Sequence, residues 1–185
     1  MAGNITENVS TGAPKLGGYA FKAPLGTALP TDAVAALNEA FASLGFISED
    51  GVTNGNSPES EDVKDWSGTT VVSVQSSKDD TWKFTLIESK NVDVLKTVYG
   101  DENVTGDLES GITIKANSKE LDYASYAFEM VMRGGTKKRV VLPKAKVTEV
   151  GDITYDKADV IGYKVTLSCA PDDEGNTHYE YIKNK

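Results

Sequence analysis

The chain has 185 residues, with 28 acidic against 19 basic side chains and a net charge of −9. This length indicates a single domain, since domains usually hold about 100–200 residues. The charge excludes a nucleic-acid binder that works through a general basic surface. One cysteine, Cys169, and one histidine, His178, exclude an internal disulfide, a thiolate zinc site and most histidine metal cages, and we expect no cofactor.

The sequence shows no targeting or membrane-spanning pattern. No apolar run approaches the ~18 residues that cross a bilayer. The first twenty residues lack the basic start and the apolar stretch of a secretion signal. We therefore expect a protein that is made in the cytoplasm, contacts no membrane and is not an enzyme.

Residues 1–30 are rich in glycine, alanine, proline, serine and threonine and follow no sustained period. The glycines and prolines argue against a long packed element. We expect an extended N-terminal arm, with a short strand near Tyr19 and Phe21, that becomes ordered by lying on another surface. The rest of the chain, residues 31–185, is predicted to form a single β-sandwich domain.

Two segments show the spacing of an amphipathic helix. Residues 31–45 repeat apolar side chains three or four positions apart, after a Thr-Asp pair that can cap the start and before a glycine that can end it. Residues 91–100 show a shorter stripe between a capping Asn91 and a terminal Gly100. Both helices are expected to cover a sheet.

Most of the remaining chain alternates apolar and polar residues with period two, as half-buried strands do. Such stretches cover residues 69–76, 81–88, 112–116, 124–130, 138–150, 161–169 and 178–182. In the first, Thr70, Val72 and Val74 form the predicted core side. Gly134-Gly135 suits a tight hairpin turn, and Pro143 predicts either an edge strand or a bulge. The pattern predicts a mainly β fold, a β-sandwich or small barrel, with one or two covering α-helices.

Charge is segregated along the chain. Residues 49–68 hold six acids and one base, and we interpret them as a long acidic loop, because loops beyond ~12–15 residues are usually functional or disordered. Trp66, at the exit of this loop, either contacts another subunit or caps the core. Residues 133–146 hold six basic residues and no acid. They are solvated strand charges, a contact for an acidic segment of another subunit, or a DNA site. The DNA alternative is the weakest, because no aromatic residues interleave for base stacking.

No catalytic constellation stands out. Acid pairs such as Asp79-Asp80 are interpreted as solvated turn residues. Cys169 lies in phase with the apolar face of its strand and is interpreted as a buried, inert thiol. His178 has no partner at a motif-defined spacing, and no glycine motif for phosphate binding occurs.

The order of these features resembles a known family. The acidic segment ends in DVKDWSGTTV, and the chain continues through TWKFTLIESKNVDVLKTVYGDENV and GGTKKRVVLPKAKVTEVGDITY to a last strand that leads to CAPDDEGN. From about Leu29 to Asn176, this layout resembles the major tail protein of long, non-contractile-tailed bacteriophages, the subunit that polymerises into the tail tube. None of the shared motifs is catalytic.

The resemblance implies hexameric rings that stack into a hollow tube, in which one sheet of each subunit joins its neighbours in a lumen-lining barrel. Genomic double-stranded DNA would pass through without specific binding. The resemblance also implies a component of the virion tail, assembled in the host cytoplasm, with tape-measure and tail terminator proteins as partners. The alternatives are a type VI secretion or contractile-injection tube protein, and a secreted β-sandwich adhesin or carbohydrate-binding module.

Such an assembly needs complementary surfaces and closure of open sheet edges. We expect apolar contacts from the arm and docking of the two oppositely charged segments, although each exposed ion pair adds only about 0–1 kcal/mol. The predicted contact residues are Tyr19, Phe21, Leu25, Glu59, Glu61, Asp62, Asp65, Trp66, Lys137, Lys138 and Arg139. A polar face suited to the lumen is formed by Ser73, Gln75, Thr81, Lys83 and Thr85, in which the lysine runs against a negative wall.

Overall fold

The computed structural model describes residues 3–184, so the first two residues of the predicted arm and the last residue of the predicted domain lie outside it. Among the described residues there is one α-helix, α1 (Val92–Tyr99), with short 3₁₀ turns at 6–8, 101–103 and 133–135. The strands are β1 (Gly12–Pro14), β2 (Ala20–Pro24), β3 (Ala42–Ser43), β4 (Thr53–Lys64), β5 (Thr70–Leu86), β6 (Val104–Thr105), β7 (Thr113–Ile114), β8 (Ala124–Met132), β9 (Lys137–Val150), β10 (Tyr163–Cys169) and β11 (Tyr179–Lys183).

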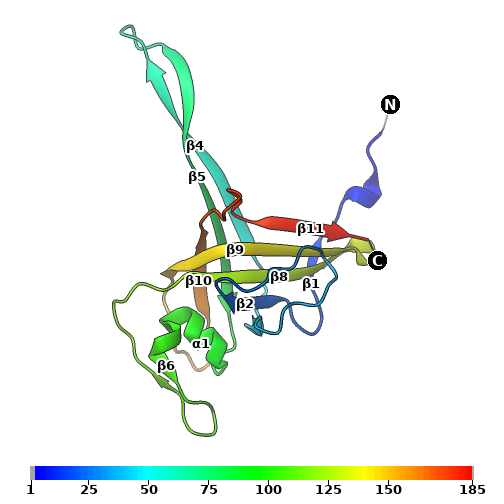
Figure 1. Ribbon diagram of the computed structural model, residues 1–185, viewed down its shortest axis with the longest axis vertical. Helices are drawn as coiled ribbons and strands as arrows, with labels where there is room; N and C mark the ends of the chain where they lie inside the picture. The colour runs from blue at the N-terminus through cyan, green and yellow to red at the C-terminus, as the bar shows by residue number, and fades with distance from the viewer. Residues whose placement is uncertain (1–2, 185) are drawn as a thin grey trace.

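Nine of these strands form one antiparallel sheet in the order β3-β2-β8-β9-β10-β5-β4, with β1 beside β8 and β11 beside β9. Strand β9 is its centre (Figure 1). One edge of β9 pairs with β8. The other edge is shared, because β11 pairs with residues 137–141 and β10 with residues 145–150. Strands β6 and β7 form a separate small ribbon.

The sheet curls until two distant strands pack on one another. Strands β8 and β5 are three positions apart in the sheet, which is about 14 Å if the sheet is flat. Yet the ring of Phe128 on β8 lies 5.8 Å from that of Trp82 and 5.2 Å from that of Phe84, both on β5. The predicted mainly β fold with a covering helix is therefore confirmed. Along residues 3–184 the sheet is not closed, and it ends at β3 and β4.

Helix α1 is where the sequence places it. The Asn91 side chain accepts a hydrogen bond from the N–H of Asp93 at 3.0 Å, which caps the first turn. Gly100 ends the helix with φ of 97°, a conformation that costs glycine little. Val94, Leu95 and Val98 are buried against the sheet, so the predicted stripe is the covering face.

We expect Asn91→Ala to lower the free energy of unfolding by about 1 kcal/mol, because an N–H of the first turn loses its partner. This corresponds to a melting temperature lower by about 2–4 °C, measured by thermal denaturation. Lys90→Ala is the control: Lys90 is exposed and adjacent, and its replacement should change stability by less than about 0.5 kcal/mol. Equal losses in both variants would contradict the capping role.

The prediction of a helix over residues 31–45 is wrong. The structure has turns there and then β3, which pairs with β2. The Arg139 guanidinium donates to the backbone carbonyls of Asp32 (2.9 Å) and Ala35 (2.8 Å). In a helix these carbonyls would accept from N–H groups four residues later. Leu44 and Phe41 are still buried, but in separate clusters. The apolar spacing therefore reflects contacts of this segment with two different parts of the core.

The prediction of an acidic loop at residues 49–68 is also wrong for most of that segment. Residues 53–64 form β4, which pairs along its length with β5, and the hairpin projects away from the body (Figure 1). Strand β5 unites the two strands predicted at 69–76 and 81–88. The Asp79-Asp80 turn expected between them does not exist, and Asp80 is buried inside the continuous strand.

The C-terminal half follows its alternation closely, since β8, β9, β10 and β11 lie where the pattern predicts them. Of the two alternatives at Pro143, the bulge is correct: the pairing of β8 with β9 shifts register beside it, and the Ser125 hydroxyl donates to its carbonyl at 2.7 Å. Gly134 and Gly135 form the β8–β9 turn with φ of 81° and 85°. The turn spans three residues, one more than predicted.

Candidate assembly surfaces

The largest feature outside the packed body is the free part of the β4–β5 hairpin, residues 56–79, which we call the projecting ribbon. Strand β10 pairs with β5 only from Thr81 to Leu86. Residues 70–79 of β5 therefore have β4 on one side and, among the described residues, no strand on the other. An isolated two-stranded ribbon is marginal in water, and its open edges can pair with another chain.

The ribbon carries all four of the predicted acidic contact residues. Glu59, Glu61 and Asp62 lie on β4 and are exposed. Strand β4 also contains Pro58, which lacks a backbone donor. Charge and proline are devices that discourage indiscriminate pairing of an edge strand, so this edge favours a partner with complementary charge.

The tip of the ribbon, residues 65–69, is a defined turn. The Asp65 carboxylate accepts hydrogen bonds from the Ser67 hydroxyl at 2.7 Å and from the Thr69 N–H at 2.9 Å. These bonds, the one from the Ser67 hydroxyl first, lower the pKa of Asp65. Trp66 is fully exposed on this turn. Of the two alternatives for Trp66, capping of the chain's own core is therefore excluded.

One face of the ribbon near its tip is apolar. Val63 lies opposite Val72 in the β4–β5 register, Val74 follows on the same face, and Glu61, opposite Val74, borders this apolar group. About half of each side chain is exposed, 50% for Val63, 48% for Val72 and 53% for Val74. The prediction that Val72 and Val74 face the core is thus wrong for the single chain. The alternation is present, but no described part of the same chain covers the apolar side.

The predicted contact residues of the arm divide into two kinds. The Tyr19 hydroxyl accepts a hydrogen bond from the Ile47 N–H at 2.8 Å, and Phe21, in the short strand β2 that was expected, packs against a buried cluster. Both side chains therefore support the fold of their own chain. Leu25 is 51% exposed and remains free to contact a neighbour.

The basic segment is not one surface patch. Arg139 is 1% exposed, and its Nε donates to Glu129 Oε1 at 2.9 Å. Lys138 pairs with Glu180 at 2.9 Å, while Lys137 is half-buried beside the β8–β9 turn. The prediction of Arg139 as a contact between subunits is contradicted by its burial, because an arginine enclosed by its own chain cannot reach another.

The structure contains two buried polar clusters that the sequence did not predict. In the first, Glu129 accepts from Arg139 and from Lys15, which ties β8, β9 and the arm together. In the second, Asp80 accepts from Thr177 and pairs with His178. Each cluster joins residues about a hundred positions apart, so no local pattern indicates them.

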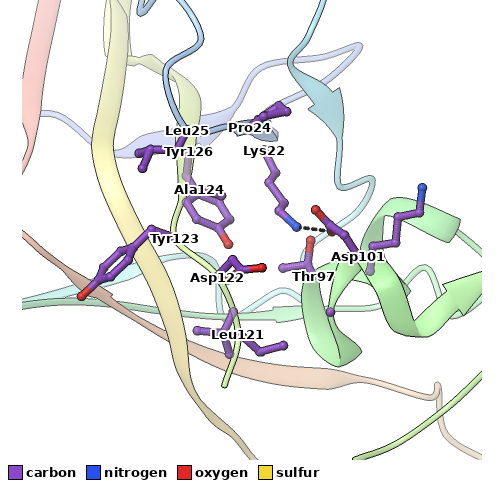
Figure 2. Close-up of a pocket in the computed structure, with 13 residues that line it drawn as sticks. Lys22, Pro24, Leu25, Thr97, Asp101, Leu121, Asp122, Tyr123, Ala124 and Tyr126 are labelled. Atoms are coloured by element: carbon purple, nitrogen blue, oxygen red, sulfur yellow. Dashed lines mark hydrogen bonds and ion pairs between the residues drawn. The ribbon is translucent and has the colours of Figure 1, made fainter. Parts of the chain in front are cut away.

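A small polar pocket lies between β2 and α1 (Figure 2). Its volume is about 140 Å³. An ion pair between Lys22 and Asp101 at 2.8 Å crosses it. These two charges therefore satisfy one another inside the pocket.

Other chemical features are few. Cys169 is half-buried, less enclosed than predicted, and burial raises the pKa of its thiol to about 12, which fits the predicted inert character. Within residues 3–184 no group of three or more His, Cys, Asp and Glu side chains is arranged to hold a metal ion. No helix in the described part of the chain is long and apolar enough to cross a membrane.

A family model described as phage tail tube protein matches residues 1–185, the whole chain. The chain belongs to the phage tail tube protein family. The resemblance seen in the sequence is thereby confirmed, and the tail tube protein is a structural component of the phage virion whose family assembles into oligomeric tubes. This family is not an enzyme class.

Among the solved structures similar to this tail tube protein is a cryo-EM structure of the anti-feeding prophage cap (AFP tube terminating cap). The similarity covers 95% of each chain, at a TM-score of 0.46 and 6% sequence identity. No curated protein matches the chain.

Proposed function

We propose that this tail tube protein forms hexameric rings and that the rings stack into a tube through which genomic DNA reaches the host cell. The observation that carries the proposal is the open sheet with its projecting ribbon. Head-to-tail contacts between identical chains satisfy such edges when they close into a ring. Six subunits per ring follow from the resemblance to the siphophage tail proteins.

The outer face of β5 and β10 is the proposed wall of the lumen. Thr81, Lys83 and Thr85 point away from the core residues Trp82 and Phe84. Polar residues of β10 lie beside them in register. The wall is polar but holds two lysines, Lys83 and Lys164. The negative charge that limits phosphate contacts and counterion release must therefore come from other residues of the chain, whose net charge is −9.

Of the predicted arm, residues 12–14 and 20–24 pair with β8 of their own chain. In this proposal the exposed Leu25, just after β2, is the part that reaches a neighbouring subunit. Assembly takes place in the host cytoplasm. The tube ends on a tail terminator protein and encloses a tape-measure protein before the DNA passes. No segment of the chain recognises a base sequence.

Electron microscopy of the purified protein tests the proposal. We expect rings or tubes of uniform diameter, with six-fold averages in end views. Discrete monomers at every concentration and ionic strength would overturn it, and rings with another number of subunits would overturn the hexamer.

We expect the acidic residues of the ribbon to contribute to the rate of tube growth. We expect Glu59→Lys/Glu61→Lys/Asp62→Lys to slow tube growth severalfold at low salt. The reversed charges would then repel basic side chains of a neighbouring copy that their own chain does not enclose, such as Arg133 and Lys137. The folded chain should be unchanged, since all three side chains are exposed. Light scattering measures growth, and circular dichroism measures folding.

The matched control is Glu109→Lys/Asp152→Lys/Asp173→Lys, which changes the net charge equally at exposed positions outside the ribbon. Its growth should stay close to that of the unmodified protein. If both triple variants slow growth equally, net charge and not the ribbon is responsible.

A further inference from the structure

The apolar face of the projecting ribbon has the alternation of a buried strand without being buried. Val63, Val72 and Val74 share one face, and the fully exposed Trp66 follows at the tip. Period-two alternation marks a strand with one covered face, and exposed apolar patches mark interaction sites. Tryptophan is also the residue type most enriched among energetic anchors of interfaces. The face and the tip therefore indicate a surface that another body covers.

A matching cavity lies at the base of the same ribbon, between β1, β8 and residues 47–52. Its volume is about 520 Å³, and Pro14, Tyr19, Phe128 and Met130 supply apolar walls. Apolar cavities of about 150 Å³ already admit benzene, so an indole ring fits in size. Ser48 is among the lining residues, and its hydroxyl is buried without a hydrogen-bond partner.

A chain cannot fill this cavity with its own tip. Strand β4 begins at Thr53, next to the cavity, and runs for 12 residues before the tip. At about 3.3 Å per residue this places Trp66 about 40 Å away. The ribbon also points away from the body (Figure 1). Only a second copy can bring a tip to the cavity.

Charges at the two surfaces are complementary. Lys64, the single base of residues 49–68, stands two positions before Trp66. Glu49 and Asp50 are exposed at the rim of the cavity. Apolar and ionic groups thus match in one arrangement.

We propose that Trp66 of one copy inserts into the cavity between β1, β8 and residues 47–52 of the next copy, with Lys64 facing Glu49 and Asp50. This deepens the proposed function and rests on it, because it names the place where the ribbon docks. The contact joins two different surfaces and so propagates from copy to copy. It offsets neighbouring copies by about the length of the ribbon.

Cross-linking between two single-cysteine chains tests the docking site. Both chains carry Cys169→Ala; one adds Thr69→Cys at the tip and the other Asp50→Cys at the rim, which leaves Trp66 and Lys64 in place. After mixing and assembly, a short bismaleimide should give a cross-linked dimer of the two chains. Thr69→Cys paired with Leu108→Cys, an exposed site on another loop, is the control and should give none. Equal yields from both pairs would overturn the proposal.

Substitutions at Trp66 and at Gly12 test the energy of the contact. Trp66→Ala should raise the protein concentration needed for tube growth at least about tenfold, while Trp66→Phe should recover part of the loss. Gly12→Leu, which fills the cavity from β1, should have an effect similar to Trp66→Ala, and the double variant should lose little more. Leu108→Ala is the control for loss of an exposed apolar side chain.

Failure of the docking site and failure of the proposed function give different results. If the unmodified chain forms no rings or tubes, the proposed function is wrong. If tubes form and Trp66→Ala grows normally, or if Trp66→Ala fails while the tip and rim give no specific dimer, the docking site is wrong and the tube remains.

Discussion

Replacing Arg139 by methionine is expected to lower the free energy of unfolding by about 3–5 kcal/mol, the usual cost of removing one partner of a buried ion pair. Arg139 and Glu129 are 1% and 3% exposed and lie opposite one another on β9 and β8. Without the guanidinium, Glu129 keeps only Lys15. The carbonyls of Asp32 and Ala35 also lose their donors. Urea denaturation followed by fluorescence measures the change.

Lys138→Met is the matched control for this prediction. Lys138 is the preceding residue of the same strand, and its ion pair with Glu180 is partly exposed. Its loss should therefore cost less than about 1 kcal/mol. The double variant Arg139→Met/Glu129→Leu should be more stable than Arg139→Met, because no buried charge is left alone. A loss for Arg139→Met as small as that for Lys138→Met would refute the structural role.

The same arginine shows why part of the fold was beyond prediction from sequence. The spacing of apolar residues in 31–45 is helical, yet Arg139, about a hundred positions away, binds the backbone carbonyls that a helix would use. Tertiary contacts override local propensity in this way. Helix α1 and strands β8 to β11 were predictable because their signals are local: a cap, a glycine stop and period two.

The prediction for the projecting ribbon failed for a different reason. Its first strand, TNGNSPESEDVK, is rich in residues that are depleted from strands, and it pairs with a strand whose apolar side no described residue covers. Composition indicated a long loop that is functional or disordered, and Glu59, Glu61 and Trp66 do lie together on one exposed element. It could not separate exposed from enclosed charges in residues 133–146, because Lys137 and Arg139 are both basic residues on the same face of β9, and only the fold shows which of them meets buried partners.

Asp80→Asn is expected to destabilise the protein by about 1–3 kcal/mol at neutral pH, since a buried, charged acceptor loses strength in its hydrogen bonds. Asp80 lies at the base of the projecting ribbon. It accepts from Asn54 of β4 at 2.7 Å and from Thr177 at 2.6 Å, and it pairs with His178 just before β11. The cluster thus fixes the angle at which the ribbon leaves the body.

At acid pH the unmodified chain should lose the extra stability that Asp80 gives it over the Asp80→Asn variant. Burial raises the pKa of this carboxyl, but the hydrogen bonds from Thr177, His178 and Asn54 outweigh it, so the pKa is lower in the folded chain than in the unfolded one. The stabilisation is complete above the unfolded pKa of about 4 and is lost as the pH falls through the folded pKa. The stability difference between the unmodified chain and Asp80→Asn should therefore shrink below about pH 4, as measured by urea denaturation across pH. Asp79→Asn, the exposed neighbour, should change stability by less than about 0.5 kcal/mol; if it matched Asp80→Asn at neutral pH, the buried cluster would not be the cause.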